Sequence, residues 1–203
     1  MTTPNRADVS RETSDALMRF VTLLEKWNAA INLIGKSTVA DIWSRHIEDS
    51  LQLARFLPGK AVLWADLGSG GGLPGLVVAI AARETSPESR FVLVESDLRK
   101  ATFLREASRQ LALPVTVHAN RIEGLAPINA DILSARALAP LRILCGYADR
   151  HLKPDGFALF PKGELAAQEI TEARSQWAFD VDSVPSLTQS SAQILKLKGL
   201  RHV

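Results

Sequence analysis

The sequence predicts an α/β protein with a doubly wound, mostly parallel sheet and a helical N-terminal segment. Two observations lead to this fold class. Apolar residues recur at helical spacing over the first 57 residues, and beyond that point short apolar runs of strand length alternate with helical patterns. Such alternation is typical of βαβ units whose helices cover both faces of a parallel sheet. We expect a helical cap (1–57) and a core (58–203), packed as one domain.

The N-terminal segment is expected to form two amphipathic helices. Ser10 is a favourable N-cap residue for the first of them. The second is expected from about Thr38 to Phe56, and the Pro58-Gly59 pair ends it. Apolar residues of the first helix lie at helical spacing, namely Leu17, Phe20, Val21, Leu24, Trp27 and Ile31. Trp27 and Trp43 are expected to pack in the core.

The core is expected to contain five parallel strands followed by an antiparallel pair. The runs rich in Val, Ile, Leu and Phe are 61–66, 91–95, 115–118, 130–135 and 157–163. Helical patterns lie between them at 73–83, 98–111 and 140–151. Two further runs, 179–185 and 192–200, have no helical pattern between them. Antiparallel strands can follow one another without a crossover helix, so we expect an antiparallel C-terminal strand on this sheet.

Composition excludes several classes of protein. The single cysteine, Cys145, rules out a disulfide framework and a Cys/His zinc cluster, and we expect no metal site. The start of the chain lacks a signal peptide's apolar stretch, and the longest uncharged run, 67–82, is too short to span a bilayer. We therefore expect a cytoplasmic protein with no membrane partner. The net charge of +2 does not by itself indicate a nucleic-acid partner.

A glycine-rich loop follows the first strand of the core. Residues 66–75 read DLGSGGGLPG, with five glycines within eight residues. Gly68 and Gly70 allow the backbone to approach a ligand closely, and Leu73 lies at the start of the next helical pattern. Doubly wound sheets bind ligands at the carboxyl ends of their strands. The loop is therefore a predicted ligand site.

Two classes of ligand fit this loop. Gly70, Gly72 and Gly75 match the G-x-G-x-x-G pattern of dinucleotide-binding proteins, which favours a nicotinamide-dependent oxidoreductase. However, a carboxylate at Asp66, directly before the glycines, would repel a diphosphate. It suits instead a ligand with an amine or a sulfonium group. S-adenosylmethionine has both and carries no phosphate.

Three further strand ends carry candidate ligand residues. Glu95 ends the second strand, where an acid accepts hydrogen bonds from ribose hydroxyls in nucleotide-binding folds. The loop 120–123 follows the third strand and would close over an adenine, with Ile122 against the ring. Arg136 follows the fourth strand and is expected to face the cleft.

These motifs together resemble the RsmG family, also called glucose-inhibited division protein B. Its members are small-subunit ribosomal RNA guanine-N(7) methyltransferases. The resemblance covers nearly the whole chain. It rests on VSRET (9–13), LLEKWNAAINL (23–33), RHIEDSL (45–51), DLGSGGGLPG (66–75), VESDLRKATFLRE (94–106), NRIE (120–123), SARALAPL (134–141) and KG (162–163).

The resemblance implies a bacterial enzyme with the Rossmann-like class I methyltransferase fold, using S-adenosylmethionine. It also implies 16S rRNA as the substrate, within the small ribosomal subunit or an assembly intermediate. We expect a monomer, because no exposed heptad pattern occurs. The family's cofactor positions fall on Gly68, Leu73, Ile122, Glu123 and Arg136, and Glu95 matches the ribose-binding acid of the wider fold.

The implied chemistry needs few catalytic groups. The N(7) lone pair of guanine is free at neutral pH, so an in-line methyl transfer needs alignment but no general base. Arg136 is the predicted catalytic residue, because arginine pairs well with the guanine oxygen, and this role competes with its cofactor role. Cys145 lies in an apolar helical pattern and is expected to be buried, not nucleophilic. His46 is expected to be structural.

Binding of RNA requires cations that contact phosphates. Arg45, Arg121 and Lys162 are the predicted contacts. Two other functions remain open besides the oxidoreductase. One is a methyltransferase for a small molecule or a protein, and the other is an RNA-binding assembly factor without catalytic activity.

Overall fold

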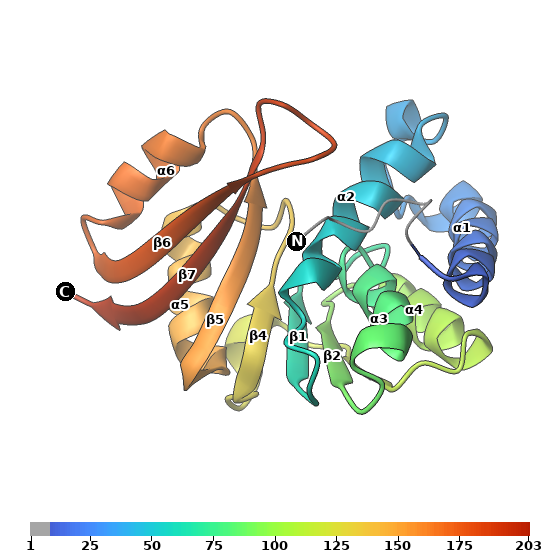
Figure 1. The fold of residues 1–203 in the computed structure, drawn as a ribbon, viewed down its shortest axis with the longest axis horizontal. Helices are drawn as coiled ribbons and strands as arrows, with labels where there is room; N and C mark the ends of the chain where they lie inside the picture. The colour runs from blue at the N-terminus through green and yellow to red at the C-terminus, as the bar shows by residue number, and fades with distance from the viewer. Residues whose placement is uncertain (1–8) are drawn as a thin grey trace.

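The computed structural model describes residues 9–203, which form one seven-stranded sheet in the order β3-β2-β1-β4-β5-β7-β6 (Figure 1). The first five strands pair in parallel, and β7 pairs antiparallel with both β5 and β6. The predicted fold class and the final antiparallel pair are confirmed. The strands are β1 (Leu63–Leu67), β2 (Arg90–Val94), β3 (Val115–His118), β4 (Ala130–Ser134), β5 (Leu152–Lys162), β6 (Trp177–Pro185) and β7 (Gln193–His202).

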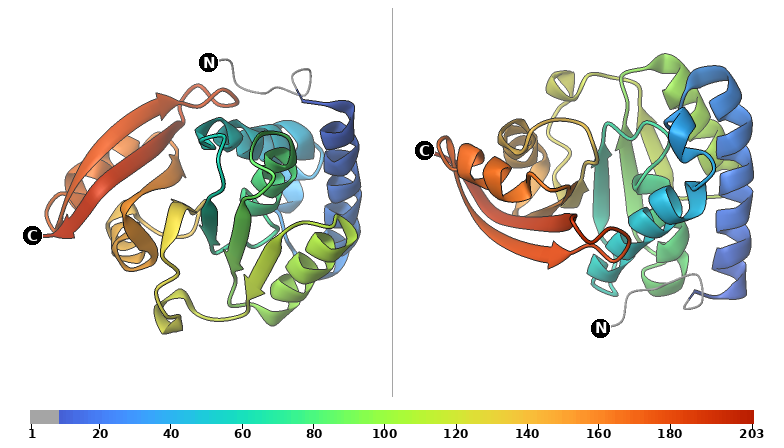
Figure 2. Two further views of the ribbon diagram at one scale, coloured as in Figure 1. Left: turned by 60° about the horizontal axis from the view of Figure 1, so that its bottom comes forward. Right: turned by 90° about the horizontal axis from the view of Figure 1, so that it is seen from above.

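Helices cover both faces of this sheet because successive side chains of a strand point to opposite sides. In β2, Phe91 and Leu93 belong to one buried cluster, whereas Val94 belongs to a second. The first cluster includes side chains of α1, α3 and α4, and the second includes side chains of α5 and α6. Figure 2 shows these two groups of helices on opposite sides of the sheet. The helices are α1 (Arg11–Ile31), α2 (Asp49–Leu51), α3 (Gly75–Thr85), α4 (Leu98–Gln110), α5 (Leu141–His151) and α6 (Ala166–Ala173).

The first predicted helix is confirmed. The Ser10 hydroxyl accepts a hydrogen bond from the Thr13 N–H at 3.1 Å, and α1 begins at the next residue, Arg11. Phe20 is fully buried, and its ring centroid lies 6.5 Å from that of Phe103 in α4. Trp27 packs against the same Phe103 ring at 5.8 Å, as expected. The N-terminal helix therefore shares a hydrophobic core with the sheet and its helices.

The second predicted helix is helical but irregular. A 3₁₀ turn at Lys36–Thr38 precedes a π-helical stretch at Trp43–Glu48, and the short α2 then leads into a second 3₁₀ segment at Gln52–Phe56. A π turn contains one more residue than an α turn and therefore rotates the side chains that follow it. Apolar periodicity alone does not reveal this change of pitch.

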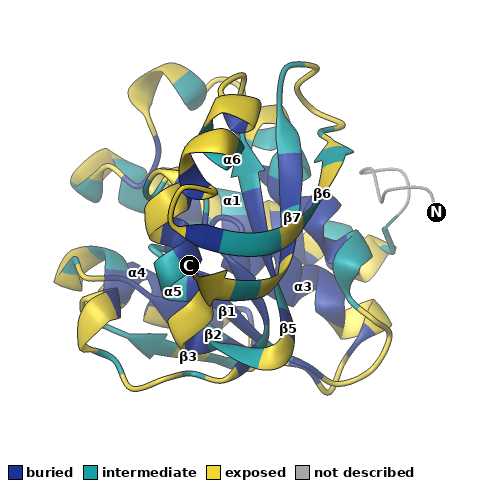
Figure 3. Cartoon of the chain, turned by 90° about the vertical axis from the view of Figure 1, so that its left-hand side faces the viewer, coloured by how far each residue is buried: buried dark blue, intermediate teal, exposed yellow. Residues whose placement is uncertain are grey.

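Two further elements differ from the prediction. β5 begins at Leu152, five residues before the predicted start at 157, and its pairing with β4 is irregular near Ala130, close to Pro154 and Gly156. The structure also contains α6, for which no helix was predicted. This helix is short and buries only Ala166 and Ala173, so exposed residues dominate its surface (Figure 3).

Within the described part of the chain, no helix is both long and apolar enough to cross a membrane.

Candidate functional site

The glycine-rich loop follows β1, the strand between β2 and β4, at the carboxyl edge of the sheet. Gly68 has a φ of +66°, and a Cβ atom there would lie 2.6 Å from Cδ1 of Leu138. At Gly75 a Cβ atom would lie 2.8 Å from Oδ2 of Asp66. Close approach therefore requires glycine at both ends of the loop.

Asp66 lies beneath this loop and is only 1% exposed. Its Oδ1 accepts a hydrogen bond from the Ser134 hydroxyl at 2.6 Å, and its Oδ2 accepts one from the Gly75 N–H at 3.2 Å. The Ser134 hydroxyl oxygen in turn accepts the Trp64 indole N–H at 2.9 Å. Burial raises the pKa of Asp66 to about 6, against the lowering effect of these hydrogen bonds. The carboxylate thus connects β1, β4 and the start of α3, and it does not lie on the open surface.

Glu95 is a second acid that contacts the loop. Its Oε2 accepts the Gly70 N–H at 2.9 Å, and its Oε1 accepts the Asp97 N–H at 2.8 Å. The parallel pairing of Leu67 with Val94 brings the two strand ends together. The predicted site residues Gly68, Gly70 and Glu95 therefore lie at one place, and Glu95 is 9% exposed.

The loop after β3 lies at the same edge of the sheet. The Glu95 N–H donates to the His118 carbonyl at 3.0 Å, which ties the end of β3 to this site. Ile122 is 8% exposed, whereas Arg121 and Glu123 are exposed. The Tyr147 hydroxyl of α5 donates to Glu123 and lowers the pKa of that carboxyl group.

Arg136 follows β4 and contacts the irregular helical segment at residues 43–51. It forms an ion pair with Asp49 at 3.1 Å and donates to the Arg45 carbonyl at 3.4 Å. Its Nη2 lies 3.2 Å from Nδ1 of His46. Because arginine can only donate, Nδ1 is the acceptor, and Nε2 of His46 carries the proton that it donates to Thr38 Oγ1 at 2.7 Å. Burial and the Arg136 charge lower the pKa of His46 to about 4.

Asp49 and His46 were not predicted as site residues from the sequence. Both occur in the RHIEDSL segment: His46 lies in the π-helical stretch, Asp49 begins α2, and both contact Arg136. The one available signal was their membership of that motif. Their contact with an arginine about 90 residues away follows only from the tertiary structure.

Lys162 is engaged inside the protein. Its Nζ lies 2.7 Å from Oε2 of Glu169 and donates to the Ala139 carbonyl at 2.9 Å. The lysine side chain is 10% exposed, so an RNA phosphate would have to displace Glu169 to reach it. Glu169 lies on α6, which was not predicted, and this explains why the pairing was not foreseen. Arg45 and Arg121 are exposed.

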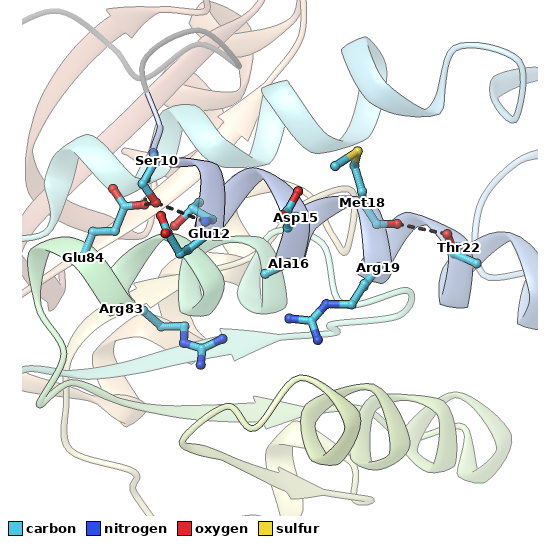
Figure 4. Close-up of a pocket in the computed structure, with 10 residues that line it drawn as sticks. Ser10, Glu12, Asp15, Ala16, Met18, Arg19, Thr22, Arg83 and Glu84 are labelled. Atoms are coloured by element: carbon cyan, nitrogen blue, oxygen red, sulfur yellow. Dashed lines mark hydrogen bonds between the residues drawn. The ribbon is translucent and has the colours of Figure 1, made fainter.

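A groove of about 640 Å³ opens beside Arg136, at the ends of β4 and β5. It is bounded by the loop 136–140, the end of β5, α6 and residues of the loop before β7. A larger hollow of about 1020 Å³ lies between α1 and the end of α3, near Ser10 and Glu84 (Figure 4). That end of α3 precedes β2 and therefore lies at the opposite edge of the sheet. The larger hollow is thus remote from the glycine-rich loop.

Two other expectations concern nucleophiles and metals. Cys145 is fully buried, and burial raises the pKa of its thiol to about 12, which confirms that it is a packing residue. Among residues 9–203, no group of three or more His, Cys, Asp or Glu side chains is arranged to hold a metal ion.

Comparison with solved structures supports the fold class. The ribosomal protein L11 methylase of Lactobacillus delbrueckii subsp. bulgaricus superposes with a TM-score of 0.57 at 19% identity, over 73% of this chain and 77% of that one. The structure of P. horikoshii TYW2 in complex with MeSAdo gives a TM-score of 0.57 at 14% identity, over 77% of this chain and 62% of that one. These similarities show the fold alone.

Comparison of sequences identifies the family. The family model described as rRNA small subunit methyltransferase G matches residues 13–197. A protein of Cereibacter sphaeroides named ribosomal RNA small subunit methyltransferase G is 60% identical over 196 residues, which is 97% of this chain and 95% of the relative. A protein of the same name from Ruegeria pomeroyi is 51% identical over 199 residues, with 98% and 97% covered. The chain therefore belongs to the rRNA small subunit methyltransferase G family.

Proposed function

We propose that this methyltransferase transfers the methyl group of S-adenosylmethionine to N(7) of a guanine in 16S rRNA. The observation that carries the proposal is the hydrogen bond of 2.9 Å between Gly70 N–H and Glu95. It joins the glycine-rich loop of β1 to the acid at the end of β2, at the edge of the sheet where doubly wound folds bind nucleotides. Membership of the rRNA small subunit methyltransferase G family supports methylation of small-subunit rRNA.

The residues at this edge fit S-adenosylmethionine better than a dinucleotide. The carboxylates of Glu95 and Asp66 flank the loop, where they would repel a diphosphate and attract a sulfonium or amine. Asp66 is ionised at pH 7 because its pKa is about 6. These charges count against a nicotinamide-dependent oxidoreductase.

We assign the following parts of the site to the cofactor. Glu95 would accept hydrogen bonds from the ribose hydroxyls, in exchange for or in addition to the Gly70 N–H. Ile122 and Glu123 would lie at the adenine. The backbone of Gly68, Gly70 and Leu73 would lie along the methionine part, with Arg136 at its far end.

Methyl transfer to N(7) requires few catalytic groups. S-adenosylmethionine, when bound, supplies a methyl group activated by its positive sulfur. The chain's residues would orient the guanine with N(7) toward that methyl group, and no proton would have to be removed first. Arg136, which is held by Asp49 and His46, would donate to the guanine oxygen next to N(7). His46 acts through the arginine, because both ring nitrogens already have partners.

Arg45 and Arg121 are the proposed phosphate contacts, since both are exposed and neighbour site residues. We propose that the protein acts as a cytoplasmic monomer on the small ribosomal subunit or an assembly intermediate.

The test is methyl transfer from labelled S-adenosylmethionine to small subunits that lack the modification. Borohydride–aniline treatment then cleaves the RNA at N(7)-methylguanine. Label in the RNA and cleavage at a single guanine are expected. Label without cleavage would overturn the N(7) assignment. Absence of label in the RNA, despite binding of the cofactor in calorimetry, would favour an assembly role or another substrate.

A further inference from the structure

The groove beside Arg136 has the position expected of a second ligand site. It lies at the carboxyl ends of β4 and β5, next to the strand end that carries the glycine-rich loop. Leu138 lines the groove, and the same side chain lies against Gly68, where it would contact a Cβ atom at 2.6 Å. A molecule in the groove is therefore separated from the proposed cofactor loop by one side chain. The volume of about 640 Å³ lies within the range of small-molecule sites.

The walls of this groove combine polar groups with apolar surface. Arg136 provides N–H donors, and Glu169 provides a carboxylate. Leu165 also lines the groove and is 64% exposed. Leu138 and Pro140 add further apolar surface. Apolar side chains together with a donor and an acceptor suit a nucleobase.

Two hydrogen bonds hold the Glu169 carboxylate in place, and both are accepted by the same oxygen atom. Its Oε2 accepts the Leu141 N–H at 2.6 Å and the Lys162 ammonium at 2.7 Å. Its Oε1 accepts no hydrogen bond from any residue in the described range 9–203. A carboxylate fixed by two hydrogen bonds needs little rearrangement to bind a donor. Glu172 differs, because it is exposed and its hydrogen-bond partner is Gln168 of the same helix.

We infer that this groove receives the target guanine and that Oε1 of Glu169 accepts a hydrogen bond from its 2-amino group. The inference rests on the proposed function and identifies the residue that selects the base. Guanine carries acceptors at N(7) and O6, and its amino group lies on the opposite side of the ring. With O6 at Arg136 and N(7) toward the cofactor, the amino group points to the side of the groove away from the arginine. Adenine has no amino group at that position.

The test replaces the target guanine by inosine, which lacks only the 2-amino group. Small subunits are assembled from ligated 16S rRNA with guanine or inosine at that one position, and methyl transfer is measured. For the wild-type protein we expect kcat/KM to fall about tenfold or more with inosine, the effect of losing a hydrogen bond to a charged group. Equal rates on the two RNAs would overturn the inference without any variant.

The variant Glu169→Gln sharpens this test. Its carbonyl oxygen can keep the bonds from Leu141 and Lys162, whereas its amide nitrogen places a donor where Oε1 was. We expect kcat/KM on guanine to fall at least about tenfold and the preference for guanine over inosine to shrink below about threefold. Cofactor affinity, measured by calorimetry, is expected to stay within about threefold and reports that the variant is folded.

Glu172→Gln is the matched control, because it removes the same charge from the same helix and groove. We expect it to keep the preference for guanine. A Glu169→Gln protein that keeps that preference would overturn the inference while leaving the proposed function intact. Failure of the wild-type protein to methylate guanine-containing subunits would instead overturn the proposed function.

Discussion

At the scale of single residues, the site depends on buried polar groups whose partners come from distant segments. Asp66 is the clearest case, because its carboxylate is buried and bonded to Ser134 and to the Gly75 N–H. A Cβ atom at position 75 would collide with that carboxylate. The aspartate and the glycine thus depend on each other, and together they determine where α3 begins.

The pKa of Asp66 leads to a pH-dependent stability. Its pKa of about 6 in the folded protein lies above its ordinary value of 3.8, so the folded state binds the proton more tightly. This stabilisation is fully present below about pH 4 and is lost as the pH rises through 6. Relative to Asp66→Asn, which does not titrate, the free energy of unfolding should fall by up to roughly 3 kcal/mol between pH 4 and 7.

Urea unfolding of both proteins across this pH range measures the effect. Other titrating groups are common to the two proteins and cancel in the difference. A difference that does not vary with pH would contradict the raised pKa of Asp66.

Substitution of Arg136 is expected to lower the rate of methyl transfer. Arg136→Ala should lower kcat/KM for methyl transfer by about 10², as expected for loss of a positioned donor. Arg136→Lys should recover only part of this loss, since an ammonium group cannot contact Asp49 and His46 as the planar guanidinium does. Kinetics and calorimetric binding of S-adenosylmethionine separate the two proposed roles. Intact turnover together with intact cofactor affinity in Arg136→Ala would exclude both.

At the scale of elements, the N-terminal helices serve both stability and the site. α1 packs on α3 and α4, and the π-helical stretch presents His46 while Asp49 follows directly after it. In a regular α-helix, these side chains would point in other directions relative to the preceding turn, because an α turn contains one residue fewer than a π turn. The pitch of this segment therefore decides which groups meet Arg136.

We expect α1 to unfold together with the sheet. Phe20→Ala removes a fully buried ring that contacts Phe103, so it should cost about 3–5 kcal/mol in a single cooperative transition. Met18→Ala, at a side chain that is 41% exposed on the same helix, should change the stability by less than about 0.5 kcal/mol. Denaturant unfolding followed by circular dichroism and by tryptophan fluorescence tests this. Two separate transitions would show instead that the helical cap folds independently.

At the scale of the whole molecule, the net charge of +2 is too small to attract RNA by itself. RNA binding should therefore depend on particular cations and on the shape of the protein surface. Arg45 and Arg121 are exposed, whereas the ammonium group of Lys162 is paired with Glu169. The electrostatic contribution to binding should therefore come from few residues near the site.

Salt dependence measures that contribution. Arg45→Ala and Arg121→Ala should each reduce the slope of log K against log salt concentration by about one for binding to small subunits. Arg109→Ala provides the control, because Arg109 is exposed at the end of α4, at the opposite edge of the sheet, and pairs with Glu106 at 2.8 Å. Equal slopes for all three variants and the wild-type protein would exclude Arg45 and Arg121 as phosphate contacts.

Local patterns in the sequence were enough to predict most of the fold. The Ser10 cap, the strand 115–118 and the helix that ends at His151 occur where they were expected. Each depends on interactions within a few residues, such as a capping hydrogen bond or an alternation of apolar side chains. The prediction was incomplete at β5 and wrong by omission at α6, where Pro154 and Gly156 interrupt the pattern and where few apolar residues are buried.

Local patterns were enough to place along the chain the strands, all the longer helices, the glycine-rich loop and the acid at the end of the neighbouring strand, because short-range periodicity and backbone freedom encode them. The partners of the charged side chains could not be read from such patterns and follow from the packing of the folded chain. Arg136 meets Asp49 across 87 positions of the chain, and Lys162 is paired with Glu169. Such pairs depend on how helices pack against the sheet, and no local pattern records which charges that packing brings together.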